Sequence, residues 1–153
     1  MMVPMEFCNV QPSIVLIGAG QLGSRHLQSL TTLCNANIDV VDPSENALTI
    51  AKERANECGD FSANIRYLSD MSELGGHYDV AIIATNAAVR FSVTNALLSA
   101  VSIKHVIFEK VLFQQPSEYD LMARLLAEKK VDGVVNCPRR MYQLYQWVKQ
   151  EYL

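Results

Sequence analysis

The sequence predicts a doubly wound α/β fold, in which helices cover both faces of a parallel sheet of about six strands. Short apolar runs alternate with helical patterns along the chain, which implies parallel strands joined by right-handed crossovers. Three glycines with the spacing G-x-G-x-x-G follow the first apolar run, and an acidic residue ends the second. Together these observations predict a Rossmann-type sheet with the strand order 3-2-1-4-5-6.

The bulk properties fit one domain. The chain has 153 residues, of which 50% are hydrophobic and 19% charged, enough for a single core. Its formal net charge of −3 predicts no binding to nucleic acid or to an anionic membrane surface. No apolar run approaches the length of about 20 residues that a membrane-spanning helix needs. Residues 1–12 carry two prolines and are expected to form a leader before a dinucleotide-binding domain over residues 13–153.

The cysteines and histidines predict no metal site. The four cysteines form no C-x-x-C pair, which fits reduced thiols in the cytoplasm. The three histidines have no partners at metal-ligand spacing. We interpret His26 as a polar filler on the first helix, His77 as a residue of a glycine loop, and His105 as paired locally within its strand.

The glycine turn has the features that a dinucleotide pyrophosphate requires. Gly18 lets the chain turn off the first strand, Gly20 lets backbone approach a phosphate, and Gly23 lets the next helix pack near the strand. Gln21 and Leu22 lie in the first turn of that helix, where free N–H groups and the helix dipole favour an anion. A chance glycine cluster in a loop is the alternative, and the strand–turn–helix context disfavours it.

The remaining elements follow from apolar periodicity and from residues that end helices and strands. Strands are predicted over residues 13–17, 38–42, 65–68, 78–84, 104–109 and 131–135. Helices are predicted over about residues 20–34, 44–58, 87–101, 116–130 and 138–152, with a single turn at 70–74. Pro43 ends the second strand, and Ser44 caps the helix after it. The continuous apolar run behind Asp79 is typical of a central strand that is covered on both faces.

Ligands of this fold bind beyond the carboxyl ends of the strands, so the residues after each strand form the candidate site. They are residues 18–22, 42–44, 85–87 and 109–111, and those from Asn136 onward. Asn136 is a weaker candidate, for contact with substrate.

Asp42 is the most informative of these residues. It follows Gly23 by 19 residues, close to the spacing of about 20 expected for an acid that binds the adenosine ribose. Its carboxylate would accept hydrogen bonds from both ribose hydroxyls and repel a 2′-phosphate, and neither Pro43 nor Ser44 supplies a positive charge. The sequence therefore predicts NAD in preference to NADP. Alternatively, Asp42 only opens a turn or caps the second helix.

Two further pairs of polar residues end strands. Thr85 and Asn86 end the fourth strand, where they would face the nicotinamide-side ribose or the pyrophosphate, or cap the next helix. Glu109 and Lys110 close the fifth strand over the cofactor crevice. A lysine there can transfer a proton to or from a substrate oxygen during hydride transfer. On physical grounds alone, an exposed salt-bridged pair is favoured.

The order of these motifs resembles the N-terminal domain of the glucose–fructose oxidoreductase, inositol dehydrogenase and rhizopine-catabolism family (Gfo/Idh/MocA). The resemblance covers almost the whole chain from residue 13. The matching segments are IGAGQLGSRHLQSL from Ile17, VVDPSENA from Val40, YDVAIIATN from Tyr78, HVIFEK from His105 and VNCPRRMY from Val135.

The resemblance implies an oxidoreductase that transfers hydride between a nicotinamide cofactor and a hydroxyl or keto carbon of a sugar, cyclitol or sugar nucleotide. It also implies roles for three residues. Lys110 matches the family's catalytic or substrate-contacting lysine. Glu109 precedes it as in the family's Glu-Lys-Pro pattern and is expected to contact the cofactor. Arg140 matches a recurrent arginine that faces substrate or the second domain.

The chain departs from the family pattern at three positions. Val111 stands where the family usually has a proline whose peptide bond is commonly cis, and a trans bond is expected before a valine. Asn86 stands where the family has a proline, and Arg90 stands where it has a histidine. The replacement of that proline by Val111 leaves the orientation of Lys110 open.

Family members also carry a second, mostly antiparallel domain, which supplies further catalytic residues, substrate walls and the usual oligomer interface. The resemblance implies that this C-terminal domain is absent from the present chain. The chain alone is then expected to bind a dinucleotide with little or no turnover, and the full-length protein to be a homo-oligomer. An apolar face near residues 141–153 would be left exposed.

Two other functions fit parts of the pattern. A non-catalytic dinucleotide-binding or redox-sensing module is favoured slightly by the missing proline and histidine. A methyltransferase that uses S-adenosylmethionine also places glycines after its first strand and an acid after its second. Such enzymes usually carry an acidic residue near the end of the first strand, where this chain has Val15, Leu16 and Ile17.

Overall fold

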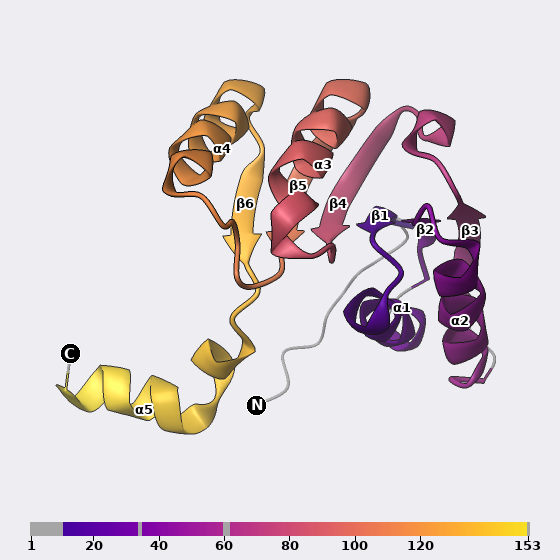
Figure 1. Cartoon of the computed structure of the whole chain (residues 1–153). Coiled ribbons are helices and arrows are strands. Elements are labelled where there is room, and N and C mark those ends of the chain that lie inside the picture. Colours follow the sequence, from indigo (N-terminus) through magenta and orange to yellow (C-terminus); the bar gives the residue numbers. More distant parts are fainter. Residues whose placement is uncertain (1–10, 34, 60–61, 153) are drawn as a thin grey trace.

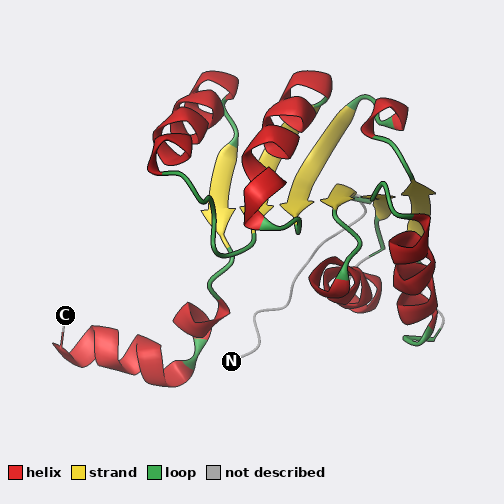
Figure 2. Ribbon diagram, in the orientation of Figure 1, coloured by secondary structure: helices red, strands yellow, loops and turns green. Residues whose placement is uncertain are grey.

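The computed structural model describes residues 11–33, 35–59 and 62–152 of the chain, so most of the expected leader lies outside it. Its centre is a six-stranded sheet in the order β3-β2-β1-β4-β5-β6, with every neighbouring pair parallel. The sheet and the helices packed along it are visible in Figures 1 and 2. The predicted Rossmann topology is therefore confirmed.

The elements lie close to their predicted positions. The strands are β1 Ser13–Ile17, β2 Asn37–Val41, β3 Asn64–Leu68, β4 His77–Ile83, β5 Ser102–Phe108 and β6 Asp132–Val135. The α-helices are α1 Gln21–Leu33, α2 Glu45–Asn56, α3 Ala87–Ala100, α4 Pro116–Lys129 and α5 Gln143–Tyr152. Two short 3₁₀ helices are η1 Met71–Glu73 and η2 Pro138–Met141. Among these described helices, none is long and apolar enough to cross a membrane.

Two apolar layers hold the helices on the sheet. On one face Leu27 of α1 and Ala51 of α2 pack against strand residues such as Leu16. On the other face Leu97 of α3 and Met122 of α4 pack in a separate cluster. The strand residues alternate between these clusters because successive side chains of a strand point to opposite faces. The central strands β1 and β4 contribute to both layers, as the continuous apolar run of β4 predicts.

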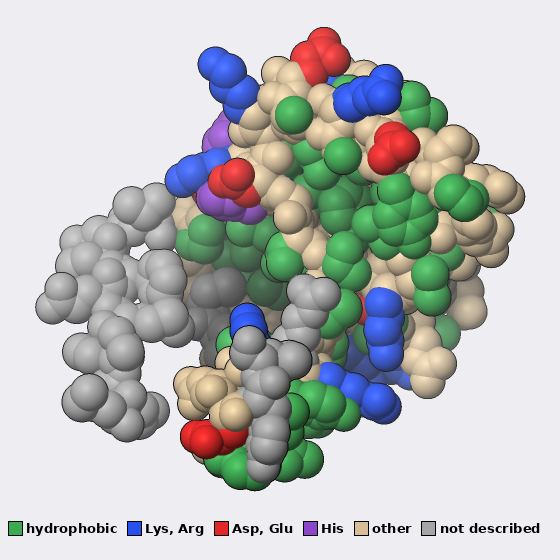
Figure 3. All heavy atoms as spheres, turned by 90° about the vertical axis from the view of Figure 1, so that its left-hand side faces the viewer, with side chains coloured by type: hydrophobic (Ala, Val, Ile, Leu, Met, Phe, Trp, Pro, Cys, Tyr) green, Lys and Arg blue, Asp and Glu red, His purple; other side chains and the backbone are tan. Residues whose placement is uncertain are grey.

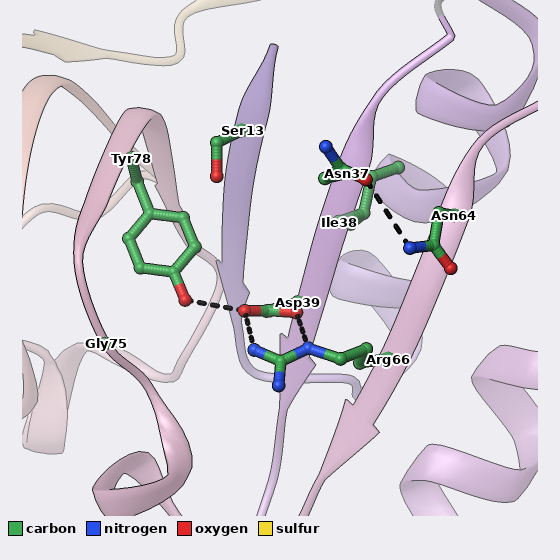
Figure 4. A pocket seen from close by; sticks show the side chains of 8 residues that line it. All are labelled: Ser13, Asn37, Ile38, Asp39, Asn64, Arg66, Gly75 and Tyr78. Atoms are coloured by element: carbon green, nitrogen blue, oxygen red, sulfur yellow. Dashed lines mark hydrogen bonds and ion pairs between the residues drawn. The ribbon is translucent and has the colours of Figure 1, made fainter. Parts of the chain in front are cut away.

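The crossover from β3 to β4 contains only the short helix η1, and a polar network links β2, β3 and β4. Asp39 of β2 is 7% exposed and accepts hydrogen bonds from Arg66 Nε at 2.7 Å and Nη2 at 2.6 Å. The Tyr78 hydroxyl donates to Asp39 at 2.5 Å (Figure 4). Burial opposes ionisation of Asp39, but the bonds from Arg66 and Tyr78 leave its pKa below the usual range. Asp39 and Arg66 lie in the middle of β2 and β3, and Tyr78 lies near the start of β4, so the network is away from the glycine turn.

The C-terminal segment projects from the domain. The structure divides the predicted last helix into η2 and α5, with Tyr142 in an extended conformation between them. In Figure 1, α5 extends away from the sheet. Apolar residues of this segment are exposed, as the sequence predicts, and Met141 is 79% accessible. Figure 3 views the molecule from this side and shows hydrophobic side chains over much of the face, with charged groups scattered among them.

Candidate functional site

The glycine turn is shaped by close backbone contacts. Gly18 has φ of 96°, a conformation that side-chain-bearing residues rarely adopt. A Cβ at Gly23 would lie 1.8 Å from the carbonyl oxygen of Gly18, so only glycine fits where α1 crosses β1. A Cβ at Gly20 would meet no heavy atom within 4 Å. The turn is therefore tight on its inner side and open at Gly20, where Gln21 and Leu22 begin α1 with exposed side chains.

Asp42 fastens this turn to the end of β2. Its Oδ2 accepts a hydrogen bond from the Ala19 N–H at 2.8 Å, and its Oδ1 accepts one from the Ser44 N–H at 2.8 Å. Ser44, rather than Asp42, caps α2 by accepting from the Ala47 N–H at 3.3 Å. A carboxylate has about four acceptor sites, so two bonds leave capacity for ligand hydroxyls. Asp42 therefore does open a turn, as the alternative interpretation expected, and its remaining acceptor sites are still available to a ligand.

A cavity of about 570 Å³ opens beside the turn and Asp42. Beyond the residues of the predicted strands and strand ends, its wall includes Ser69, Asp70, Met71, Val89 and Val93. The first three directly follow β3, so the same strand-end rule, applied to β3, would have found them. Asp70 Oδ1 accepts from the Ser72 N–H at 2.7 Å. Hydrogen bonding to the Ser72 side chain, and then to its N–H, lowers the pKa of Asp70.

Thr85 and Asn86 line the same cavity at the end of β4. Asn86 caps α3, because its Oδ1 accepts from the N–H groups of Ala88 at 3.1 Å and Val89 at 3.3 Å. The Thr85 hydroxyl oxygen is buried and has no hydrogen-bond partner among the residues that the structure describes. The helix-capping alternative therefore applies to Asn86, and Thr85 retains an unused polar atom.

Arg90 organises the loop after β5. Its side chain, only 2% exposed, donates through Nη1 to the carbonyl oxygens of Glu109 at 2.5 Å and Leu112 at 3.1 Å, and also to that of Val111. Its Nη2 donates to the Thr85 carbonyl. Burial lowers the pKa of Arg90, and the nearby Glu109 charge opposes that shift. This position was identified only as a departure from the family; the structure shows that it ties the ends of β4 and β5 together.

The peptide bond that follows Lys110 is cis, so the expectation of a trans bond before Val111 is wrong. The carbonyls of Glu109 and Val111, on either side of this bond, both accept from Arg90. Lys110 itself is exposed at the carboxyl end of β5.

Glu109 is not part of an exposed salt-bridged pair with Lys110. It is 3% exposed, and its Oε1 lies 2.8 Å from His26 Nε2 and 2.5 Å from Asn136 Nδ2. His26 is therefore more than a polar filler on α1, because it contacts a carboxylate at the end of β5. His105 pairs with Asp132 of β6 at 3.4 Å rather than within its own strand.

The remaining predicted residues divide into two groups. Asn136 joins the Glu109 cluster, while Arg140 lies in η2 and its side chain is not among those described. Within the described part of the chain, no group of three or more potential metal ligands occurs. The site thus has a cavity on the Asp42 side of the glycine turn and the Glu109 cluster at the ends of β5 and β6.

Solved structures of dehydrogenases share this fold. UDP-N-acetylglucosamine 3-dehydrogenase GnnA from Acidithiobacillus ferrooxidans superposes with a TM-score of 0.70 at 20% identity, over 94% of this chain and 44% of that one. The WlbA dehydrogenase from Chromobacterium violaceum, in complex with NADH and UDP-GlcNAcA, gives a TM-score of 0.74 at 20% identity, over 98% and 42%. An oxidoreductase from Agrobacterium radiobacter, in complex with NAD⁺, L-tartaric acid and magnesium, gives 0.75 at 19% identity, over 92% and 40%.

The chain spans less than half the length of these solved chains. The comparison with curated proteins finds no match. A family model, described as the oxidoreductase family with an NAD-binding Rossmann fold, matches residues 13–136. That match contains the glycine turn, Asp42, the β4 end and the Glu109 cluster. The chain therefore belongs to the Gfo/Idh/MocA oxidoreductase family and forms its NAD-binding Rossmann domain.

Proposed function

We propose that this domain holds NAD across the glycine turn and presents it for hydride transfer to or from a hydroxyl or keto carbon of a sugar-like substrate. The observation that carries the proposal is the turn itself. It is closed by backbone contact at Gly23, open at Gly20, and continuous with a cavity that contains Asp42. A pyrophosphate beside Gly20 would accept hydrogen bonds from the free N–H groups of the first turn of α1.

The adenosine half is assigned to the cavity on the Asp42 side. The carboxylate of Asp42 has acceptor capacity left for the ribose hydroxyls, and Met71, Val89 and Val93 supply apolar surface for a base. A 2′-phosphate at this position would meet the negative charge of Asp42, and no cation lines the cavity among the described residues. This arrangement supports NAD as the preferred cofactor over NADP.

The nicotinamide half is assigned to the ends of β4 and β5, near Thr85, Asn86 and Glu109. When bound, NAD supplies the carbon that accepts or donates hydride. Lys110, exposed beyond β5, would take or give the proton of the substrate oxygen. Asn136 and Arg140 follow the neighbouring strand β6 and are the candidates for substrate contact.

The complete enzyme requires more than this domain. We assign the substrate walls and the subunit interface to a second domain outside the present chain, with a homo-oligomer as the working form and the cytoplasm as its location. A sugar nucleotide is the favoured substrate class, because GnnA is a UDP-N-acetylglucosamine dehydrogenase and the WlbA complex contains UDP-GlcNAcA. The chain alone would bind the cofactor and turn over little substrate.

Cofactor binding is tested by titrating the chain with NADH and following NADH fluorescence. Gly20→Ala places a methyl group in the open space assigned to the phosphate, and we expect at least about a tenfold loss of NADH affinity. Gly75→Ala is the matched control, because a Cβ at Gly75 also meets no heavy atom within 4 Å but lies away from the turn. Both variants should keep the thermal stability of the parent chain.

Three outcomes are informative. Equal NADH affinity of Gly20→Ala and Gly75→Ala would refute the assigned site. Binding of S-adenosylmethionine in place of NADH would favour the methyltransferase. NADH binding by the full-length protein, without turnover of any sugar or sugar nucleotide in a broad panel, would favour the non-catalytic module.

A further inference from the structure

We propose that His26 and Asn136 are positioning residues that fix the buried carboxylate of Glu109, so that its free oxygen accepts a hydrogen bond from the nicotinamide-side ribose. This inference rests on the proposed NAD site and extends it to two residues. His26 comes from α1, Glu109 follows β5, and Asn136 follows β6. Three separate elements therefore meet at one carboxylate at the carboxyl edge of the sheet.

The two contacts use the same carboxylate oxygen. His26 Nε2 and Asn136 Nδ2 approach Oε1 of Glu109 at 2.8 Å and 2.5 Å. A carboxylate is an acceptor, so both nitrogens donate. Among the residues that the structure describes, Oε2 makes no hydrogen bond. The carboxylate is thus held at one oxygen and left with an unused acceptor at the other.

The cluster is rigidly anchored. The Asn136 N–H donates to the Phe108 carbonyl at 2.7 Å, so the backbone that carries one donor is itself fixed to β5. The Glu109 carbonyl is held at 2.5 Å by the buried Arg90 guanidinium. A side chain that is fixed at both its backbone and its carboxyl group retains little freedom to reorient.

The unused oxygen remains within reach of a ligand. The Glu109 side chain is 4% exposed, and its Oε2 is not among the buried polar atoms that lack a partner, so this oxygen keeps access to solvent. A ribose hydroxyl is a donor, and it would satisfy that oxygen without adding charge. His26 also belongs to the helix whose first turn is assigned to the pyrophosphate. One helix would therefore orient both the phosphates and the acceptor for the second ribose.

The alternative is that the contact only fastens α1 to the sheet. A fastening contact would affect every ligand of the glycine turn alike, whereas a positioning contact would affect only ligands that possess the second ribose. ADP carries the adenosine and diphosphate but no second ribose, and NADH carries both halves. The pair of probes therefore separates the two roles.

The experiment measures the affinities of NADH and ADP, together with thermal unfolding, for the parent chain, His26→Ala, His26→Gln and Asn136→Ala. We expect His26→Ala to weaken NADH about tenfold, the effect of one charge-assisted hydrogen bond, and to leave ADP within about twofold. His26→Gln keeps an N–H donor and should recover most of the NADH affinity. Asn136→Ala should repeat the selective loss in case His26→Ala folds poorly.

His105→Ala is the matched control, because His105 also pairs with a carboxylate but at mid-strand, away from the strand ends. Equal losses for NADH and ADP in His26→Ala and Asn136→Ala, or no loss for either, would overturn the inference. Failure of the parent chain to bind both NADH and ADP would instead refute the proposed function. ADP binding that is lost in Gly20→Ala would show that the pyrophosphate site itself is correct.

Discussion

The guanidinium of Arg90 on α3 donates to the backbone carbonyl of Glu109 at 2.5 Å and spans the space between the ends of β4 and β5. The Arg90 side chain is buried, yet the partners of its Nη1 after β5 are backbone carbonyls rather than a carboxylate. Backbone carbonyls in a loop need hydrogen-bond donors, which a neighbouring strand or helix would otherwise supply, and here Arg90 supplies them. The loop that carries Lys110 is thus held by a side chain of α3, the helix before β5.

Removal of this guanidinium should destabilise the domain. Arg90→Ala would leave the carbonyls of residues 85, 109, 111 and 112 without this donor and open a cavity, and we expect the free energy of unfolding to fall by about 3 kcal/mol. Urea unfolding measures the change. The exposed Arg25, replaced in the same way, should change it by less than about 0.5 kcal/mol. Similar small effects for both variants would contradict the bridging role.

Gly23 should tolerate no side chain. Its Cβ would lie 1.8 Å from the Gly18 carbonyl oxygen, so Gly23→Ala must push α1 away from β1. We expect a loss of more than about 3 kcal/mol in the free energy of unfolding and loss of NADH binding. Gly133→Ala provides the comparison, because its Cβ would meet the flexible end of Leu126 at 2.8 Å, and the cost should be about 1 kcal/mol. Equal costs would show that the turn relaxes freely.

The bonds of Asp42 predict a double effect on cofactor binding. Asp42→Ala removes the acceptor of the Ala19 and Ser44 N–H groups as well as the charge near the ribose. NADH affinity should fall by about tenfold or more, while NADPH should lose much less, so that the preference for NADH narrows. Parallel fluorescence titrations with both cofactors measure the ratio. Unchanged NADH affinity would exclude the ribose role of Asp42.

The Asp39–Arg66–Tyr78 network predicts a loss of stability at both extremes of pH. The pKa of Asp39 is lowered in the folded protein, so its contribution is present above the unfolded pKa of about 3.9 and is lost as pH falls through the folded value. Burial, followed by the bond to Asp39, raises the pKa of Tyr78 to about 12. The contribution of Tyr78 is complete below the unfolded pKa of about 10 and is lost as pH rises toward the folded value.

Urea unfolding of the parent chain, Asp39→Asn and Tyr78→Phe across the pH range gives a curve of stability against pH with an acid arm and an alkaline arm. Asp39→Asn should reduce the loss of stability in the acid arm, and Tyr78→Phe should reduce it in the alkaline arm. Tyr145→Phe, at an exposed position on α5, should leave both arms as in the parent. If the alkaline loss of stability persists in Tyr78→Phe, that loss must come from the titration of another group.

The sequence alone determined the order of the elements and the place of the cofactor turn. The glycine spacing, the apolar run of β4 and the acid after β2 are local signals, because each depends on a few neighbouring residues and the period of one element. They predicted the strand order and the strand ends where the site lies. Asn86 and Ser44 were likewise recognisable as caps from residue type and position.

Only the tertiary structure decided which distant side chains meet. Glu109 and His26 are 83 residues apart, and no local period places one against the other. Arg90 reaches Glu109 across 19 residues, and it marks the loop where the peptide bond before Val111 is cis. These contacts arise because the sheet brings the ends of β4, β5 and β6 to one edge and lays α1 beside them. Side-chain partners at such an edge depend on how elements pack, whereas propensity and periodicity describe each element by itself.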